Sequence, residues 1–320
     1  MTIPILGMGQ LAATSPELGN KVKNLAILAR AGVRVPRGFG LPYSVYTDFV
    51  ADLLPTMQRV REQATDYSDM AKRLHEIVVS ASLDGAESVT EALETHMPGA
   101  THFAVRSSGA PIISGREAAE DSAGLSLAGQ YESFLLVPAY NVPQAILWCY
   151  ASLFAERCLR QFKVQEDGRY LWSRMSVLVQ EMCLADLSAV VMTRDPVEGG
   201  DNFGMEVTYG ACESLVSGEV QGDLYLLSRT TGAVLSAEVG TKTSSIGYEP
   251  MTSFEIGNKI KQPLSEELSM RYAASEGLIA EIYRLGMHIE EHFGSPQDIE
   301  LVVANGEIIV TQTRPITTSK

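Results

Sequence analysis

Residues 296–316, PQDIELVVANGEIIVTQTRPI, decide the fold. Two β-rich apolar runs flank Asn305-Gly306, a dipeptide that favours the tight turn of a β-hairpin. Side chains two apart on a strand face the same side, so Gln312 and Arg314 share one face. A hairpin here, in a chain without regular alternation of strands and helices, predicts an α+β fold with mixed, largely antiparallel sheets.

The turn decides whether Glu300 joins that face. A strict two-residue turn pairs Glu300 with Thr311 and puts Gln312 on the opposite face, whereas a three-residue turn pairs Glu300 with Val310 and gathers the polar residues on one face. If they meet, a carboxylate and an amide oxygen suit Mg²⁺, and the neighbouring Arg314 suits phosphate. The alternative is an edge strand that is wetted by solvent.

A helix is predicted to precede this hairpin. It starts at Ser265, with Glu266 and Glu267 in the first turn, where carboxylates favour the helix dipole, and it stops at Gly294. Its expected buried stripe is Tyr272, Ile279, Ile282, Ile289 and Phe293.

Four β-rich runs lie in the middle of the chain. MSVLVQEMC (175–183) and SAVVMTRDP (188–196) are separated by a short polar link, which predicts adjacent strands. NFGMEVTYG (202–210) and GDLYLLSR (222–229) are two further strand candidates.

Helical patterns dominate the first half of the chain. GNKVKNLAILARAGVRVPRGF (19–39) predicts a helix that Gly32 closes. Residues 44–97 are expected to be mostly helical, and residues 141–163 are expected to form another amphipathic helix.

Composition limits the possible functions. The chain has 320 residues, 45% of them hydrophobic, which is enough for two lobes. Its net charge of −14 disfavours binding to nucleic acid or to an anionic membrane surface. The four scattered cysteines suggest free thiols in a reducing compartment, and no signal peptide or membrane span is expected. A cytoplasmic setting follows as the expectation.

Two basic residues are candidates for holding phosphate. Lys21 lies at the start of the first predicted helix, where free N–H groups already favour anions, although most lysines are simply solvated. Arg106 ends the apolar run 103–105 and opens a long loop of Gly, Ser and Ala, which lets backbone N–H groups approach a ligand. A structural ion pair of Arg106 and a plain linker are the alternatives.

Together these motifs resemble the ATP-binding domain of the phosphoenolpyruvate synthase and pyruvate phosphate dikinase family, which has an ATP-grasp fold. The resemblance runs nearly end to end through LGNKVKNLAILARAGVRVPRGFGL, FAVRSS…AAEDSAGLSLAGQYESFLLV, VLVQEM, SAVVMTRDP, EVTYGACESLVSG and PQDIELVV…VTQTRPIT. It implies an N-terminal lobe over 1–175, with a phosphate-covering loop at about 106–133, and a C-terminal lobe over 176–320. The two lobes would form one ATP-binding unit.

The resemblance also implies roles for single residues. Lys21, Arg106 and Arg314 would act on the phosphates as catalytic groups. The other expected ligands are Gly129 and Ser133 near the phosphates, Gln180, Met182 and Cys183 beside the adenine, and Glu300 and Gln312 on Mg²⁺. The implied cofactors are ATP and Mg²⁺, and the implied activity is that of an ATP-dependent phosphotransferase.

Departures from the family pattern leave the acceptor open. The family's second glycine is Asn20, an extra piece occupies about 109–117, and Arg116 within it could compete with Arg106. None of the five histidines lies in a context like the family's Thr-Ser-His carrier motif. The preferred hypothesis is therefore transfer to a histidine on a separate carrier. The alternatives are a stand-alone small-molecule kinase or ligase and a nucleotide-binding module without turnover.

Overall fold

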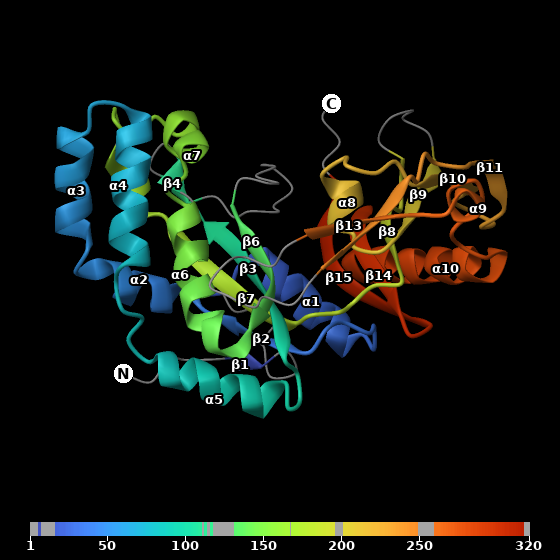
Figure 1. Ribbon diagram of the computed structural model, residues 1–320, viewed down its shortest axis with the longest axis horizontal. Helices are drawn as coiled ribbons and strands as arrows, with labels where there is room; N and C mark the ends of the chain where they lie inside the picture. The colour runs from blue at the N-terminus through green and yellow to red at the C-terminus, as the bar shows by residue number, and fades with distance from the viewer. Residues whose placement is uncertain are drawn as a thin grey trace. The chain divides into compact units, whose positions relative to one another are not determined.

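The computed structural model describes residues 6–7, 17–110, 112–113, 116–117, 131–166, 168–195, 201–248 and 259–316 (Figure 1). The chain divides into two compact units. The first unit is made of Met1–Ala26, Arg37–Met182 and Pro250–Gly257, and the second of Ile27–Pro36, Cys183–Glu249 and Asn258–Lys320. The main crossing of the chain from the first unit to the second lies between residues 182 and 183. The lobe boundary expected at 175/176 falls inside the strand Arg174–Glu181 of the first unit.

An antiparallel sheet of five strands forms the centre of the first unit. Its order is β1-β2-β7-β3-β6, with β1 (Leu6–Gly7), β2 (Gly38–Leu41), β7 (Arg174–Glu181), β3 (His102–Ala110) and β6 (Ser133–Pro138). A separate pair, β4 (Ile112–Ile113) and β5 (Arg116–Glu117), lies within the segment that was expected to be the phosphate-covering loop. Residues 106–110 of that segment belong to β3, whereas 111, 114–115 and 118–130 lie outside the described residues.

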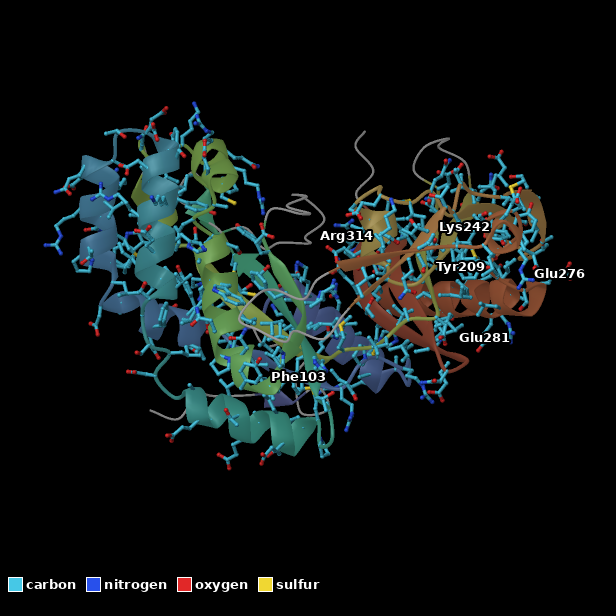
Figure 2. The ribbon with its side chains drawn as sticks, viewed as in Figure 1. Phe103, Tyr209, Lys242, Glu276, Glu281 and Arg314 are labelled. Carbon is cyan, nitrogen blue, oxygen red and sulfur yellow. The ribbon has the colours of Figure 1, made fainter. Side chains whose placement is uncertain are left out.

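Helices cover one face of this sheet and form the larger core with it. They are α2 (Tyr43–Ala51), α3 (Leu54–Gln63), α4 (Tyr67–Val79), α5 (Ala86–His96), α6 (Val142–Ser152) and α7 (Glu156–Gln161), with the short 3₁₀ turns η1 (Ala139–Asn141) and η2 (Gly168–Trp172). Alternate residues of β3 and β7 enter this core. Phe103 of β3, labelled in Figure 2, and Val179 of β7 are fully buried there. The predicted helical character of 44–97 is confirmed.

The start of α1 (Asn20–Arg30), which belongs to the first unit up to Ala26, packs on the opposite face of the sheet. Gly40 makes this approach possible, because a Cβ there would lie 2.7 Å from a methyl carbon of Val22. Gly32, with φ of +78°, follows the helix as predicted, since glycine adopts the left-handed conformation at little cost. Gly40 pairs with Leu178, so Leu178 and its alternates on β7 face α1.

The second unit is built on an antiparallel sheet of six strands. Its order is β11-β10-β9-β8-β14-β15, with β11 (Val234–Glu238), β10 (Asp223–Ser228), β9 (Asn202–Tyr209), β8 (Leu187–Met192), β14 (Gln297–Ala304) and β15 (Glu307–Pro315). A smaller sheet pairs β12 (Ser244–Tyr248) with β13 (Lys259–Pro263). The predicted α+β class with largely antiparallel sheets is confirmed.

The helix α10 (Glu276–Phe293) packs on one face of the six-stranded sheet (Figure 1). Gly286 lets it approach, because a Cβ there would lie 2.8 Å from the ring of Phe203. Ile282 and Ile289 of the helix and Ile299 of β14 are almost fully buried. The residues that alternate with Ile299 therefore face away from α10. Two short helices, α8 (Glu213–Val216) and α9 (Glu266–Ser269), complete the unit.

Three sequence predictions were wrong in detail. The runs at 175–183 and 188–196 are not adjacent strands, because β7 belongs to the first unit and β8 to the second, and their link is the passage between units. The helix expected over 141–163 breaks at 153–155, where Ala155 is extended, with ψ of 142°.

The third error concerns the helix expected from Ser265. Two helices form instead, because Ser265 and Ser275 each cap one, accepting hydrogen bonds from the N–H groups of Leu268 and Leu278. Tyr272 lies between them with 42% of its surface exposed, so it does not belong to the buried stripe.

Candidate functional site

Lys21 and the Arg106-Ser107-Ser108 segment meet in the first unit. Lys21 Nζ donates a 3.0 Å hydrogen bond to the carbonyl oxygen of Ser107, and the Lys21 backbone N–H donates to Ser108 Oγ at 3.4 Å. Only 9% of the surface of Lys21 is exposed. Gly19 allows this contact, because a Cβ there would lie 2.0 Å from Ser108 Oγ. The sequence indicated Lys21 and Arg106 separately, and the fold brings their segments together.

Other predicted residues of the first unit share the face that carries α1. Arg106 of β3 lies directly opposite Ser133 of β6, so the two side chains project from the same face. On β7, Gln180 pairs with Gly38 and with Ala104, which alternates with Arg106 on β3. Arg106, Ser133 and Gln180 are therefore held on one side of the sheet. The sheet register explains why residues from three distant segments converge.

Gln180 carries a specific signal for a ligand. It is 2% exposed, and its Nε2 has no hydrogen-bond partner within the described part of the chain. A buried amide that lacks a partner costs free energy, so a missing hydrogen-bond acceptor is expected beside it.

The end of β7 is held by an ion pair next to Gln180. Arg37 donates from Nε and Nη2 to the two carboxylate oxygens of Glu181, at 2.7 and 2.8 Å. The hydrogen bond to Glu181 raises the pKa of the Arg37 guanidinium. Met182 and Cys183 follow directly. Met182 ends the longest segment of the first unit, and Cys183 begins the longest segment of the second unit. Gly129 lies outside the described residues.

In the second unit, Glu300 and Gln312 lie directly opposite each other on β14 and β15. The turn is the two-residue one, with Asn305 and Gly306 at φ of 52° and 78° and Ala304 paired with Glu307. Neither register considered from the sequence is found. One extra residue on β15, Thr311, shifts the pairing between Leu301 and Glu300 and brings Gln312 opposite Glu300.

Arg314 and Asp298 also pair with each other, two pairs along the same ladder from Glu300 and Gln312. Arg314 donates to Asp298 Oδ2 from Nε at 2.9 Å and from Nη2 at 2.7 Å. Both residues alternate with the buried Ile299 and Thr313, so they lie on the same face as Glu300 and Gln312. Sequence reasoning missed Asp298. Its position two residues before Glu300 was the available signal, because side chains on a strand repeat every second residue.

The face of β14–β15 offers oxygen ligands and a cation side by side. Within the described residues, no group of three or more His, Cys, Asp or Glu could hold a metal ion by itself. The carboxylate of Glu300 and the amide oxygen of Gln312 instead fit Mg²⁺ that takes its other ligands from phosphate and water. Among the described helices, none combines the length and the apolar composition that crossing a bilayer requires.

The fold and these polar faces define an α+β protein with the residue types that bind a phosphorylated, metal-bound ligand. Residues 15–320 match the family described as pyruvate phosphate dikinase, AMP/ATP-binding domain, and the chain belongs to this family.

Relatives from archaea and bacteria cover almost the whole chain. A probable phosphoenolpyruvate synthase of Methanothermobacter thermautotrophicus is 31% identical over 94% of this chain and 44% of its own length. A probable phosphoenolpyruvate synthase of Archaeoglobus fulgidus is 29% identical over 99% of this chain and 42% of its own length. A rifampicin phosphotransferase of a Streptomyces species is 31% identical over 96% of this chain and 35% of its own length. The chain thus spans less than half the length of these relatives.

Proposed function

We propose that this chain is the ATP-grasp nucleotide-binding unit of a phosphotransferase, which binds ATP with Mg²⁺ and passes phosphate to an acceptor outside the chain. The observation that carries the proposal is the row of Glu300, Gln312 and Arg314 on one face of β14–β15. Family membership supports an adenine nucleotide as the ligand.

The proposed roles follow the chemistry of each side chain. Lys21 and Arg106 bind phosphate oxygens in the first unit, with Ser133 and Gly129 near them, and Arg314 binds the phosphate that is transferred. The buried Gln180 amide, whose Nε2 has no partner among the described residues, donates to the adenine, and Met182 and Cys183 border the ring. Positioned cations and donors are most of what phosphoryl transfer requires from a protein.

Glu300 and Gln312 hold Mg²⁺ in this proposal. The bound ion would neutralise charge on the phosphates and so favour their displacement. One carboxylate and one amide suit an ion that is shared with phosphates, and Arg314 lies two pairs along the same ladder, on the same face. Asp298 keeps that guanidinium oriented through two hydrogen bonds.

The preferred acceptor is a histidine on a separate carrier. A neutral imidazole nitrogen attacks phosphorus, a P–N bond forms, and the P–O bond to the departing nucleotide breaks with its electron pair on the nucleotide oxygen. The chain's own residues bind and orient the phosphates during this step. A small-molecule acceptor is the second candidate, and the similarity to rifampicin phosphotransferases favours it.

Two measurements test the proposal. Calorimetry with a non-hydrolysable ATP analogue, with and without Mg²⁺, measures binding. Incubation with γ- or β-labelled ATP and a histidine-bearing carrier, a small molecule or neither then measures transfer. Acid-labile label on the carrier supports the preferred acceptor, and label on a small molecule without a carrier supports the second. Tight ATP binding without transfer to any acceptor would leave only a nucleotide-binding module.

Substituting Glu300 tests the metal role. Glu300→Ala should abolish Mg²⁺-dependent ATP binding, because it removes the carboxylate ligand. Glu307→Ala is the matched control, since Glu307 lies on the same hairpin and forms a surface ion pair with Arg34. Unchanged Mg²⁺-dependent binding in Glu300→Ala would remove Glu300 from the site.

A further inference from the structure

The register of the β14–β15 hairpin changes halfway along its length. From the turn to Leu301 the pairs follow the two-residue turn, with Val302 opposite Ile309 and Leu301 opposite Val310. Continued without interruption, this register would place Gln312 opposite Ile299 and Arg314 opposite Gln297. Ile299 and Gln297 are on the buried face of the sheet, against which α10 packs. Both candidate ligands would then point into the core.

A bulge at Thr311 prevents this outcome. The extra residue returns Gln312 and Arg314 to the face of Glu300 and Asp298. The hydroxyl of Thr311 donates a 3.2 Å hydrogen bond to the backbone carbonyl oxygen of Glu300. Thr311, the bulged residue, is therefore hydrogen-bonded to Glu300, the residue at which the register shifts.

A buried network holds the shifted register from the other side of the sheet. Thr313 Oγ1 donates to Gln297 Oε1 at 3.0 Å, and both residues are buried at 1% and 0% exposure. Gln297 in turn donates its N–H to Thr193 Oγ1 at 2.8 Å and its Nε2 to the carbonyl oxygen of Ser295 at 3.0 Å. Thr313 lies between Gln312 and Arg314, so anchoring it anchors both neighbours.

We propose that Thr311 and Thr313 are positioning residues for the metal and phosphate ligands of β14–β15. Their hydroxyls hold the bulged register, and the bulged register puts Gln312 beside Glu300. This inference rests on the proposed function for its ligand, Mg²⁺ with ATP, but its structural part concerns only the hairpin.

The test compares Thr311→Val and Thr313→Val with the rescue variants Thr311→Ser and Thr313→Ser. Thr90→Val is the matched control, because Thr90 also donates its hydroxyl to a backbone carbonyl, at 3.3 Å, on α5 of the first unit. The readouts are the Mg²⁺ concentration that half-saturates ATP-analogue binding, the affinity for the analogue without metal, and the melting temperature. Loss of residues that orient metal ligands typically weakens metal binding about 10–100-fold.

We expect the Mg²⁺ concentration that half-saturates ATP-analogue binding to rise at least about 10-fold in the valine variants. The affinity for the analogue without metal should stay unchanged, and the serine variants should bind Mg²⁺ like the native chain. A merely structural role would lower the melting temperature without moving the Mg²⁺ requirement. An unchanged Mg²⁺ requirement in both valine variants would overturn the inference.

A second readout does not need nucleotide binding. In Glu300→Cys/Gln312→Cys, oxidation should form a cross-strand disulfide, because the two positions are directly opposite each other. The disulfide yield should fall when Thr311→Val and Thr313→Val are added. Equal yields would overturn the inference. If the native chain binds no Mg²⁺ with ATP, the proposed function fails, and the disulfide yields still decide whether the hydroxyls hold the register.

Discussion

Arg314 and Asp298 form a two-donor ion pair across the β14–β15 ladder, with both donor nitrogens within 2.9 Å of Asp298 Oδ2. The two side chains are 27% and 14% exposed, so water screens the pair only in part. A carboxylate beside an arginine that binds phosphate has two effects: it offsets the positive charge of the guanidinium, and it fixes the direction in which the guanidinium points. In the proposed function, Asp298 would contribute to binding by fixing the direction of Arg314.

Asp298→Asn tests that contribution. The variant keeps the shape but loses the charge-assisted hydrogen bonds, so we expect the free energy of unfolding to fall by about 1–3 kcal/mol. ATP affinity should fall as well, because Arg314 gains freedom to turn. Chemical denaturation and calorimetry measure the two effects. Glu307→Gln is the control, because its exposed pair with Arg34 should contribute less than about 1 kcal/mol. Equal losses in the two variants would contradict the argument.

The faces of this hairpin could be predicted only in part. Strand periodicity and Asn305-Gly306 were enough to predict the hairpin and the shared face of Gln312 and Arg314. They could not predict the bulge at Thr311, because one inserted residue leaves no periodic pattern. The hydrogen bonds that hold the bulged register, from Thr311 to Glu300 and from Thr313 to Gln297, are known only from the fold. Whether Glu300 shares that face was thus left open by the sequence.

Long-range arrangement was harder to predict than local structure. Helices over 44–97 follow from spacing alone, but the separation of β7 from β8 depends on which sheet each strand enters. Likewise, the contact of Lys21 with Ser107 joins residues 86 positions apart. Motif order predicted the candidate residues, and only the fold shows which contacts hold Lys21 in place.

Gly19→Ala should weaken nucleotide binding through Lys21. The added methyl group would lie 2.0 Å from Ser108 Oγ, so the start of α1 must move away from β3. We expect the hydrogen bond from Lys21 Nζ to Ser107 to be lost and ATP affinity to fall about 10-fold or more, the scale of one charge-assisted hydrogen bond.

Gly277→Ala is the matched control for this prediction. Its nearest atom would be Ser275 Oγ at 3.9 Å, and it lies in α10, where alanine is the better helix former. The control should be stabilised by up to about 1 kcal/mol with unchanged ATP affinity. ATP affinity that stays unchanged in Gly19→Ala would show that Lys21 does not depend on this close approach.

Lys242, labelled in Figure 2, forms a fully buried ion pair with Asp223 in the second unit. Both side chains have 0% exposure. Asp223 also accepts hydrogen bonds from the N–H groups of Gly240 and Ala273, at 2.9 and 2.7 Å. Lys242→Met should lower the free energy of unfolding by about 3–5 kcal/mol, because it leaves a buried carboxylate without its cation.

Adding Asp223→Asn to Lys242→Met should recover part of that loss, since the amide is neutral and its oxygen can still accept one of the two backbone hydrogen bonds. Lys72→Met, at an exposed position of α4, should change stability by no more than about 0.5 kcal/mol. Urea denaturation of the three variants measures the differences. A small loss of stability in Lys242→Met would mean that the ion pair makes almost no net contribution to the free energy of unfolding.

The buried tyrosines of the first unit should respond oppositely to loss of their hydroxyls. Tyr46 and Tyr150 pack edge to face at 5.0 Å, and neither hydroxyl has a hydrogen-bond partner in the described part of the chain. Tyr170 instead donates to the carbonyl oxygen of Leu153 at 3.0 Å. Tyr46→Phe should therefore be neutral or stabilising by about 1 kcal/mol, whereas Tyr170→Phe should cost about 1–2 kcal/mol. Comparable destabilisation in both variants would indicate a buried water as the partner of Tyr46.

The same tyrosines give stability a dependence on alkaline pH. Burial raises the pKa of Tyr46, Tyr150 and Tyr170, so the folded chain keeps these protons at a pH where the unfolded chain releases them. The folded state then binds more protons, and the free energy of unfolding must fall as pH rises above about 10, the ordinary pKa of tyrosine. Phenolate absorbance should show these three rings titrating only with unfolding, and Tyr46→Phe should reduce the steepness of the decline. A native chain in which every tyrosine ionises near the ordinary pKa would contradict the prediction, because burial would then impose no penalty on the charged ring.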